Sequence, residues 1–202
     1  MSALPAEYHG IVKSFVLHCL AGAACVSSAF SEPLFNGKDL TGWKPDGADV
    51  WTFADSVLTG QSNSKKQGSV LWSTEKFKDF TLDLDFRFSG DVDSGVFLRT
   101  PNDQIQIGTS RSLKRDMTGS PYIGTTGKYA VEAHDVKGNL KEGEWNHFRI
   151  TAKGSHYTVE LNGKQVLDYS SDTAAKEGGI GLQVHPGVDM KIEFRNVDLV
   201  KG

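Results

Sequence analysis

The nine residues FTLDLDFRF at positions 80–88 alternate between apolar and polar side chains without a break. Successive side chains of a β-strand point to opposite faces of a sheet, so this pattern predicts a strand with one buried and one solvated face. Similar alternation recurs at residues 148–152, 157–161, 180–184 and 190–194. No segment after residue 30 shows a long helical period, and we therefore expect an all-β protein.

Turn signals separate these predicted strands. Asn162-Gly163 between two apolar runs is a strong hairpin signal, and Ala54-Asp55 suggests a second hairpin. In the last strand the apolar positions change from even to odd numbers before Val197, which predicts a β-bulge near Arg195-Asn196. Ten or more short strands with one apolar face each are expected to pack as two antiparallel sheets, in a single sandwich domain over residues 32–202.

The first thirty residues have a different character. Lys13 precedes a short apolar run and several small residues, a pattern typical of a secretory signal peptide over residues 1–31, with cleavage after Ala29 or Ser31. The run is short for a membrane span, so we expect a periplasmic or secreted protein with no membrane attachment after cleavage. Both cysteines, Cys19 and Cys25, lie in this leader, which excludes disulfides and thiol catalysis in the mature domain.

Charge and motifs exclude some functions and leave others open. A net charge of −3 gives no basic surface for phosphates, so nucleic acid is not an expected partner. Residues 91–95, DVDSG, resemble part of a calcium loop without its remaining ligands, so a divalent metal stays possible but is not indicated. Asp83 and Asp85, roughly 7 Å apart along one strand, would suit an inverting glycosidase, but Thr81 and Arg87 continue the same polar face, so a solvated strand face is the simpler interpretation. The oligomeric state is not indicated.

Three predicted strands carry polar side chains that a core does not explain. Their polar faces present Arg99, then Gln104 and Gln106, then Gln183 and His185. Amides can donate and accept hydrogen bonds, as a neutral polyhydroxyl ligand requires. We therefore expect these five side chains to form one concave carbohydrate site; taken singly, the glutamines could be a solvated face, Arg99 an ion-pair partner and His185 a turn residue.

Further candidates lie outside these strands. An aromatic residue such as Trp51 or Tyr122 could complete a sugar site. The segment 110–122 is long for a hairpin loop, and long ordered loops tend to be functional. It could fold over one end of the sheet and contribute Lys114, Asp116 or Tyr122, or it could be a mobile solvated loop.

Several segments together resemble one known family. They are LFNGKDLTGW (34–43), SGVFLR (94–99), GEWN (143–146), LNGK (161–164), GIGLQ (179–183) and FRNV (194–197), which occur in the order found in the 3-keto-disaccharide hydrolase domain family. The resemblance covers nearly all of the chain after the leader. It implies a concanavalin A-like jelly roll of the lectin/glucanase type, with its site on the concave sheet. Many members have Glu-x-Gln-x-x-Asp after the arginine strand, whereas this chain has QIQIGT at 104–109.

The resemblance implies cleavage of glycosides oxidised at C3, by β-elimination and hydration. Such chemistry needs a base with a pKa near neutrality and a group that stabilises the enolate. His185 is the candidate base and Arg99 the candidate oxyanion clamp, with the three glutamines holding hydroxyl groups. Because Gln104 and Thr109 replace the family's carboxylates, the alternative is a non-catalytic, lectin-like carbohydrate-binding module; a structural sandwich without a ligand is a third possibility.

Overall fold

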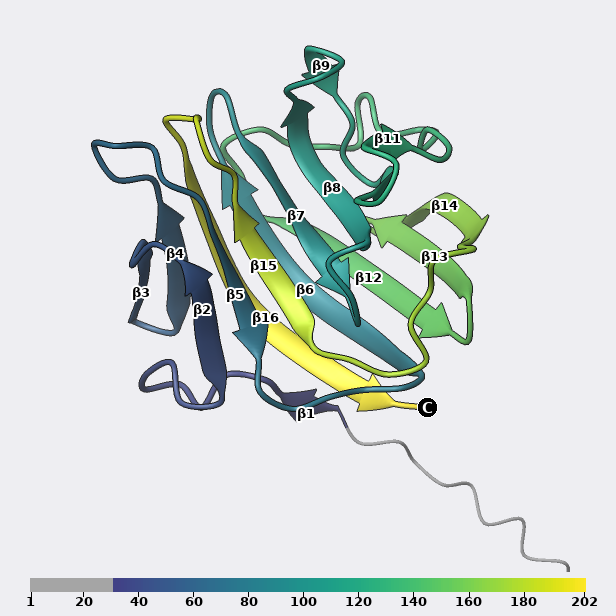
Figure 1. Cartoon of the computed structure of the whole chain (residues 1–202), viewed down its shortest axis with the longest axis horizontal. Coiled ribbons are helices and arrows are strands. Elements are labelled where there is room, and N and C mark those ends of the chain that lie inside the picture. Colours follow the sequence, from purple (N-terminus) through teal and green to yellow (C-terminus); the bar gives the residue numbers. More distant parts are fainter. Residues whose placement is uncertain (1–30) are drawn as a thin grey trace, which may run out of the picture.

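The protein is described by a computed structural model whose coordinates define residues 31–202; the predicted signal peptide, up to residue 30, lies outside them. These residues form sixteen β-strands and no helix, which confirms the all-β prediction. The strands make two eight-stranded antiparallel sheets that lie one over the other (Figure 1). Among residues 31–202 there is no helix of the length and hydropathy that a membrane crossing requires.

The first sheet has β6 and β16 at its centre. Its strand order is β14-β13-β12-β6-β16-β4-β3, and β1 pairs with the far end of β16. In chain order the strands are β1 (Glu32–Pro33), β3 (Trp51–Ala54), β4 (Val57–Gln61), β6 (Phe80–Phe88), β12 (Asn146–Lys153), β13 (His156–Leu161), β14 (Lys164–Ser170) and β16 (Lys191–Lys201).

The second sheet has β7 and β15 at its centre. Its strand order is β11-β10-β8-β7-β15-β5-β2, and β9 pairs with the end of β8. In chain order the strands are β2 (Trp43–Gly47), β5 (Ser69–Ser73), β7 (Asp93–Leu98), β8 (Asp103–Ser110), β9 (Arg115–Asp116), β10 (Pro121–Ile123), β11 (Lys128–Tyr129) and β15 (Ile180–Val184).

The inner faces of the two sheets form the hydrophobic core. The alternation at 80–88 appears in β6 as buried residues at each apolar position and half-buried residues between them. Leu82, Leu84 and Phe86 of the first sheet and Val96 and Leu182 of the second are all fully buried. Burial of one face of each strand is the main stabilising contribution, at about 25 cal/mol per Å² of apolar surface.

The predicted hairpins and the bulge are confirmed, although the turn expected at Ala54-Asp55 lies one residue later, at Asp55-Ser56. Asn162 and Gly163 have φ values of +51° and +80°, and Asp55 and Ser56 have +51° and +61°, so both hairpins turn through the left-handed conformations that two-residue loops favour. The pairing of β16 with β6 shifts register between Arg195 and Asp198.

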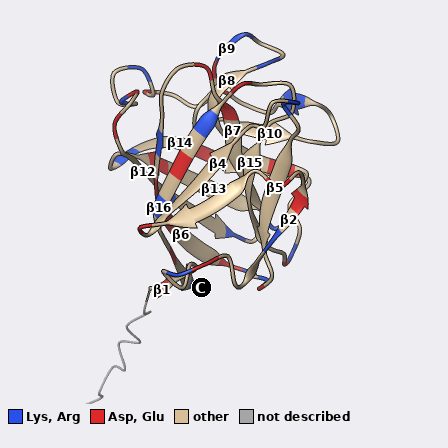
Figure 2. Cartoon of the chain, turned by 90° about the vertical axis from the view of Figure 1, so that its left-hand side faces the viewer, with Lys and Arg blue, Asp and Glu red and all other residues tan. Residues whose placement is uncertain are grey.

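The outer faces of the sheets differ. β7 and β8 are buried on both faces, and Arg111, Tyr122 and Tyr129 of the segment that follows β8 lie beside their outer side chains. Acidic and basic residues are interspersed over the molecule (Figure 2). The polar strand residues Gln104, Gln106 and Gln183 gather on this outer face of the second sheet.

Candidate functional site

A cavity of about 290 Å³ lies on the outer face of the second sheet. Its volume is close to the lower end of the range of about 300–1,000 Å³ that is typical of small-molecule sites. The cavity is lined by residues from β7, β8, β10, β11 and the ends of β15 and β8: Asp93, Phe97, Pro101, Gln104, Gln106, Ser110, Arg111, Ser112, Tyr122, Tyr129, Gln183 and His185. The structure thus brings together five of the predicted residues, namely the three glutamines, Tyr122 and His185.

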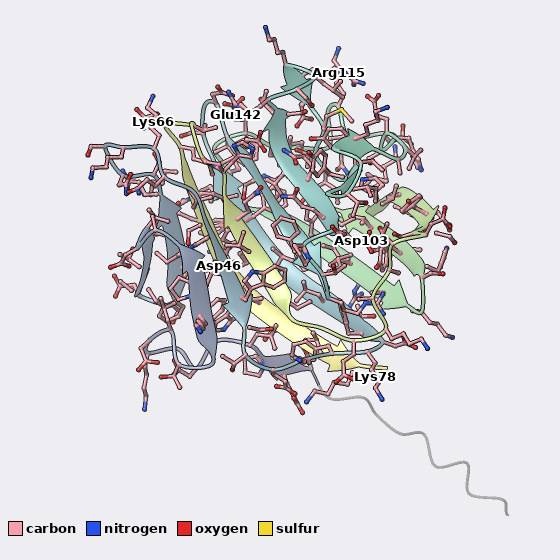
Figure 3. The ribbon with its side chains drawn as sticks, in the orientation of Figure 1. Asp46, Lys66, Lys78, Asp103, Arg115 and Glu142 are labelled. Atoms are coloured by element: carbon pink, nitrogen blue, oxygen red, sulfur yellow. The ribbon has the colours of Figure 1, made fainter. Side chains whose placement is uncertain are left out.

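The floor of the cavity is a pair of amides on adjacent strands. Gln104 Nε2 donates a hydrogen bond of 2.6 Å to Gln183 Oε1 across β7. The strand between them presents Gly95, where a Cβ would lie 2.3 Å from Gln104 Nε2. The absence of a side chain at Gly95 therefore lets the two amides meet. Gln104 directly follows Asp103, the first residue of β8, which is labelled in Figure 3.

Asp93 supplies a buried carboxylate at the other end of the floor. Its Oδ1 accepts a 2.9 Å hydrogen bond from Gln106 Nε2, and its Oδ2 accepts one of 3.1 Å from the backbone N–H of Arg111. The Arg111 guanidinium lies 3.5 Å from Asp93 through Nε and binds both oxygens of Asp91. These two hydrogen bonds, which Arg111 donates to Asp91, raise the pKa of Arg111 and lower the pKa of Asp91, so both groups are charged.

His185 has one ring nitrogen engaged and the other directed at the cavity. Its Nδ1 lies 2.6 Å from the carbonyl oxygen of Pro186, and because a carbonyl only accepts, Nδ1 must carry a proton. In the neutral ring Nε2 then keeps its lone pair, 4.0 Å from Asp93 Oδ2. The side chain is one-third exposed. This arrangement suits a general base whose protonated form has a carboxylate nearby.

Aromatic rings form a wall of the cavity. Tyr122 and Tyr129 meet edge to face with ring centroids 5.2 Å apart, and Phe97 contributes a third ring. Burial raises the pKa of Tyr129 to about 12, so its hydroxyl stays protonated at neutral pH. Amides facing aromatic rings are the combination expected for a polyhydroxyl ligand.

The structure does not place Arg99 in this cavity. Arg99 follows the last residue of β7 and has a φ of +65°, so the side-chain alternation of the strand breaks at this residue. Its guanidinium is instead fully buried and donates to the carbonyl oxygens of Lys78 and Gly154 and to the hydroxyl of Tyr157. Tyr157 in turn donates to the buried carboxylate of Asp103. Arg99 therefore belongs to an internal polar network, and the expectation that it shares the sugar site is wrong.

Three other candidates also lie elsewhere. Trp51 is buried in the first sheet, where its indole N–H donates to Ser69. Lys114 occupies the turn between β8 and β9 with an exposed side chain and lines no cavity. Asp116 lines a second, larger hollow of about 830 Å³ beside Arg115, which is labelled at the tip of this turn in Figure 3, and its carboxylate accepts hydrogen bonds from Thr118. Asp116 therefore stabilises its own turn.

Sequence reasoning missed the cavity residues Asp93, Arg111, Phe97 and Tyr129. Asp93 was considered only as part of a calcium loop, but Asp91 and Asp93 both face Arg111. Within residues 31–202 there is no group of three or more His, Cys, Asp or Glu side chains placed to hold a metal ion. The available signal was local: Phe97 is an apolar residue on the otherwise polar face of its strand, and in the sheet it pairs with Gln104.

Asp83 and Asp85 lie on the outer face of the first sheet, away from the cavity. His147 contacts both carboxylates, at 3.1 Å and 3.0 Å, and Arg149 and Arg195 bind one each. This is the solvated ion-pair face that was the simpler interpretation of the alternation.

The chain is similar to one protein family and to several solved structures. Residues 31–200 match the model of the 3-keto-alpha-glucoside-1,2-lyase-like domain family. A protein of Parabacteroides distasonis, provisionally named a glycosyl hydrolase, is 28% identical, with a TM-score of 0.67 over 86% of this chain and 100% of that one. The carbohydrate-binding module CBM66 of Bacillus subtilis is 19% identical, with a TM-score of 0.58 over 79% of this chain and 96% of the module, which shows a shared fold. No curated protein matches the chain. The predicted jelly-roll sandwich of the lectin/glucanase type is confirmed.

Proposed function

The chain belongs to the 3-keto-alpha-glucoside-1,2-lyase-like domain family, and from that premise we propose that it cleaves glycosides oxidised at C3, by β-elimination followed by hydration. The observation that carries the proposal is the cavity of about 290 Å³ on the second sheet, in which an imidazole with a free Nε2 lies with paired amides and an arginine. The protein is also proposed to act outside the cytoplasm, as the predicted leader indicates.

The proposed reaction begins with proton removal. A ketone at C3 makes the C2–H bond acidic, and His185 Nε2 takes this proton while the electrons move to the C3 oxygen as an enolate. The C1–O bond then breaks, a C1=C2 double bond forms, the ketone returns, and the leaving oxygen takes a proton from the imidazolium. Water adds across C1=C2, with its hydroxyl at C1 and a proton at C2, and gives the 3-keto sugar.

The enolate needs a stabilising cation or donor near the C3 oxygen. Arg111 is proposed for the role first considered for Arg99, because Arg111 lines the cavity and Asp91 uses only two of its five N–H donors. Asp93 would stabilise the imidazolium that forms on His185. Gln104, Gln106, Gln183 and Tyr122 would hold hydroxyl groups of the sugar.

The first prediction tests His185 as the base. In His185→Ala we expect release of sugar from methyl 3-keto-α-D-glucopyranoside to fall by about 10²-fold or more, because the group that accepts the C2 proton is removed. Affinity for the probe, measured by calorimetry, should change little. His156→Ala is the matched control, since His156 pairs with Asp168 at the edge of the first sheet and should not affect turnover. Undiminished turnover in His185→Ala would show that the base is another residue.

A second function is supported by one specific observation. The family resemblance predicts carboxylates at positions 104 and 109, but this chain has Gln104 and Thr109 there. Gln104 cannot act as a base, and its amide instead donates a hydrogen bond to Gln183. A lectin-like carbohydrate-binding module would use the same cavity without His185 chemistry. It predicts that the wild-type protein binds the 3-keto probe or its unoxidised parent and releases no sugar from either.

A further inference from the structure

A second aromatic surface lies beside the cavity, on the same face of the second sheet. Leu71 of β5 is fully buried in the core, so the neighbouring Trp72 points to the outer face, where it is half-buried. Its ring centroid is 5.5 Å from that of Phe97, which lines the cavity. The edge of the cavity therefore continues into an aromatic pair.

Glycine residues in β15 make this pairing possible. Trp72 and Phe97 both pair with Gly181, from opposite sides, and so lie two strands apart, or roughly 10 Å between backbones. A Cβ at Gly181 would lie 2.9 Å from the Trp72 ring, and a Cβ at Gly179, just before β15, would lie 3.5 Å from the same ring. Because β15 presents no side chain here, the two rings meet above it and form a nearly continuous surface.

The Trp72 ring also has a free polar group. The indole N–H groups of Trp43 and Trp51 donate to Leu34 O and Ser69 Oγ, whereas within residues 31–202 the Trp72 N–H has no acceptor and is not among the buried polar groups that lack a partner. It is therefore accessible. An aromatic face with an accessible N–H at its rim offers a sugar ring both stacking and a hydrogen-bond donor.

The strand register places this surface in line with the site. One row across the sheet runs Tyr122, Gln104, Phe97, Gly181, Trp72, each directly paired with the next. A ligand that enters the cavity between Tyr122 and Gln104 and continues along this row reaches Trp72. At about 290 Å³ the cavity is small, so a second sugar ring would lie outside it.

We propose that Trp72 and Phe97 form the surface on which the second sugar ring stacks when the oxidised ring occupies the cavity, so that Trp72 determines how strongly the protein prefers a two-ring over a one-ring glycoside. This inference rests on the proposed function and assigns a specificity-determining residue to it.

The test compares a one-ring and a two-ring probe. The probes are methyl 3-keto-α-D-glucopyranoside and maltose oxidised at C3 of its non-reducing ring, and affinities are measured by calorimetry on the full chain. We expect the wild-type protein to bind the two-ring probe about tenfold more tightly, a difference of about 1.4 kcal/mol. In Trp72→Ala the two-ring probe should lose this advantage while the one-ring affinity stays within twofold, and Trp72→Phe should restore part of it.

Trp145→Ala is the matched control. Trp145 is also half-buried on an outer face, but on the first sheet, where its ring covers the guanidinium groups of Arg87 and Arg195 at 4.6 Å and 4.1 Å. It should leave both affinities unchanged. Equal two-ring affinity in wild type and Trp72→Ala, or equal loss for both probes, overturns this role of Trp72. Binding with the expected selectivity but without sugar release would overturn the proposed lyase activity and leave the role of Trp72 standing, and no binding of either probe would overturn both.

Discussion

Gly95 is the residue on which the geometry of the cavity floor depends. It lies on the outer face of β7 between Gln104 and Gln183, whose amides share a 2.6 Å hydrogen bond. A Cβ here would come within 2.3 Å of Gln104 Nε2 and 2.7 Å of the backbone oxygen of Ile105. The Gln104 side chain can move aside, but the backbone oxygen of Ile105 is held in the β7–β8 ladder. Gly95→Ala must therefore displace both the amide pair and the strand.

We expect Gly95→Ala to weaken binding of methyl 3-keto-α-D-glucopyranoside by about tenfold or more and to lower the free energy of unfolding by about 1–3 kcal/mol. Calorimetry and denaturant titration measure the two effects. Gly90→Ala is the control: Gly90 has a φ of +72° and open space around it, so alanine costs about 1–2 kcal/mol through backbone strain alone and should not change affinity. Wild-type affinity in Gly95→Ala would show that the amide pair does not contact the ligand.

Residue-scale errors in the sequence analysis have specific causes. Strand parity assigns Arg99 to the face of Phe97, but a positive φ immediately after the strand reverses its direction, and no neighbouring residue signals that turn. Trp72 was missed because Val70, Leu71 and Trp72 are all apolar, so alternation could not show which side faces outward. Trp51 was chosen from the same limited information; it is buried beside Gly60 of the neighbouring strand and donates its indole N–H to Ser69 of the other sheet, which local alternation could not show.

At the scale of elements, the bulge in β16 is held by one carboxylate from its neighbour β6. Asp85 accepts hydrogen bonds from Arg195 and Asn196, the residues at the register shift, and from His147 of β12. Asn196 has a φ of +48°. Burial acts to raise the pKa of Asp85, but these hydrogen bonds together outweigh it and lower the pKa below its ordinary value of 3.8.

The sign of the pH effect follows from this lowered pKa. A carboxyl group whose pKa is lower in the folded state contributes stability that is fully present above the unfolded pKa and is lost as the pH falls through the folded value. We expect Asp85→Asn to lower the free energy of unfolding by about 1 kcal/mol at about pH 6, and the difference from wild type to shrink as the pH falls below about 3.8.

Denaturant titrations at several pH values measure this difference. The control is Glu132→Gln, since Glu132 has a pKa lowered by Arg115 but lies in an exposed ion pair and should contribute little at any pH. A difference for Asp85→Asn that grows toward acid pH would contradict the assignment of Asp85 as the group that holds the bulge.

The individual strands and turns could be predicted from the sequence more fully than the way in which they pack together. The alternation in β6, the Asn162-Gly163 turn and the parity change before Val197 are local signals, and each produced the expected strand, hairpin or bulge. The polar residues of β8 and β15 were also correctly expected to meet, because their strands share a sheet through β7. The part of the cavity formed by Arg111 could not be predicted, because the contact of Arg111 with Asp93 depends on how the turn after β8 folds back.

At the scale of the whole molecule, the two outer faces have opposite chemistry. The outer face of the first sheet carries a network of ion pairs, which includes Arg87 with Glu193 at 2.6 Å and Arg149 with Asp83 at 3.0 Å. The floor of the cavity on the second sheet is instead made mostly of amides and its wall of aromatic rings, with Asp93, Arg111 and His185 at one end. The first face therefore contributes to stability through charges, while the second is suited to a neutral ligand.

This division predicts that salt affects stability and ligand affinity differently. Raising NaCl from about 0.05 M to about 1 M shortens the screening length to about 3 Å, so the ion pairs of the first sheet weaken. We expect the melting temperature to fall by about 2–4 °C, equivalent to about 1 kcal/mol for a protein of this size. Glu193→Gln removes the partner of Arg87 and Lys191 and should reduce this sensitivity to salt.

Affinity for methyl 3-keto-α-D-glucopyranoside should change by less than twofold over the same range of salt, because hydrogen bonds to amides and stacking on rings are not screened. A tenfold loss of affinity in high salt would mean that Arg111 and Asp93 recognise a charged group, and the ligand would then be an acidic or basic sugar rather than a neutral one.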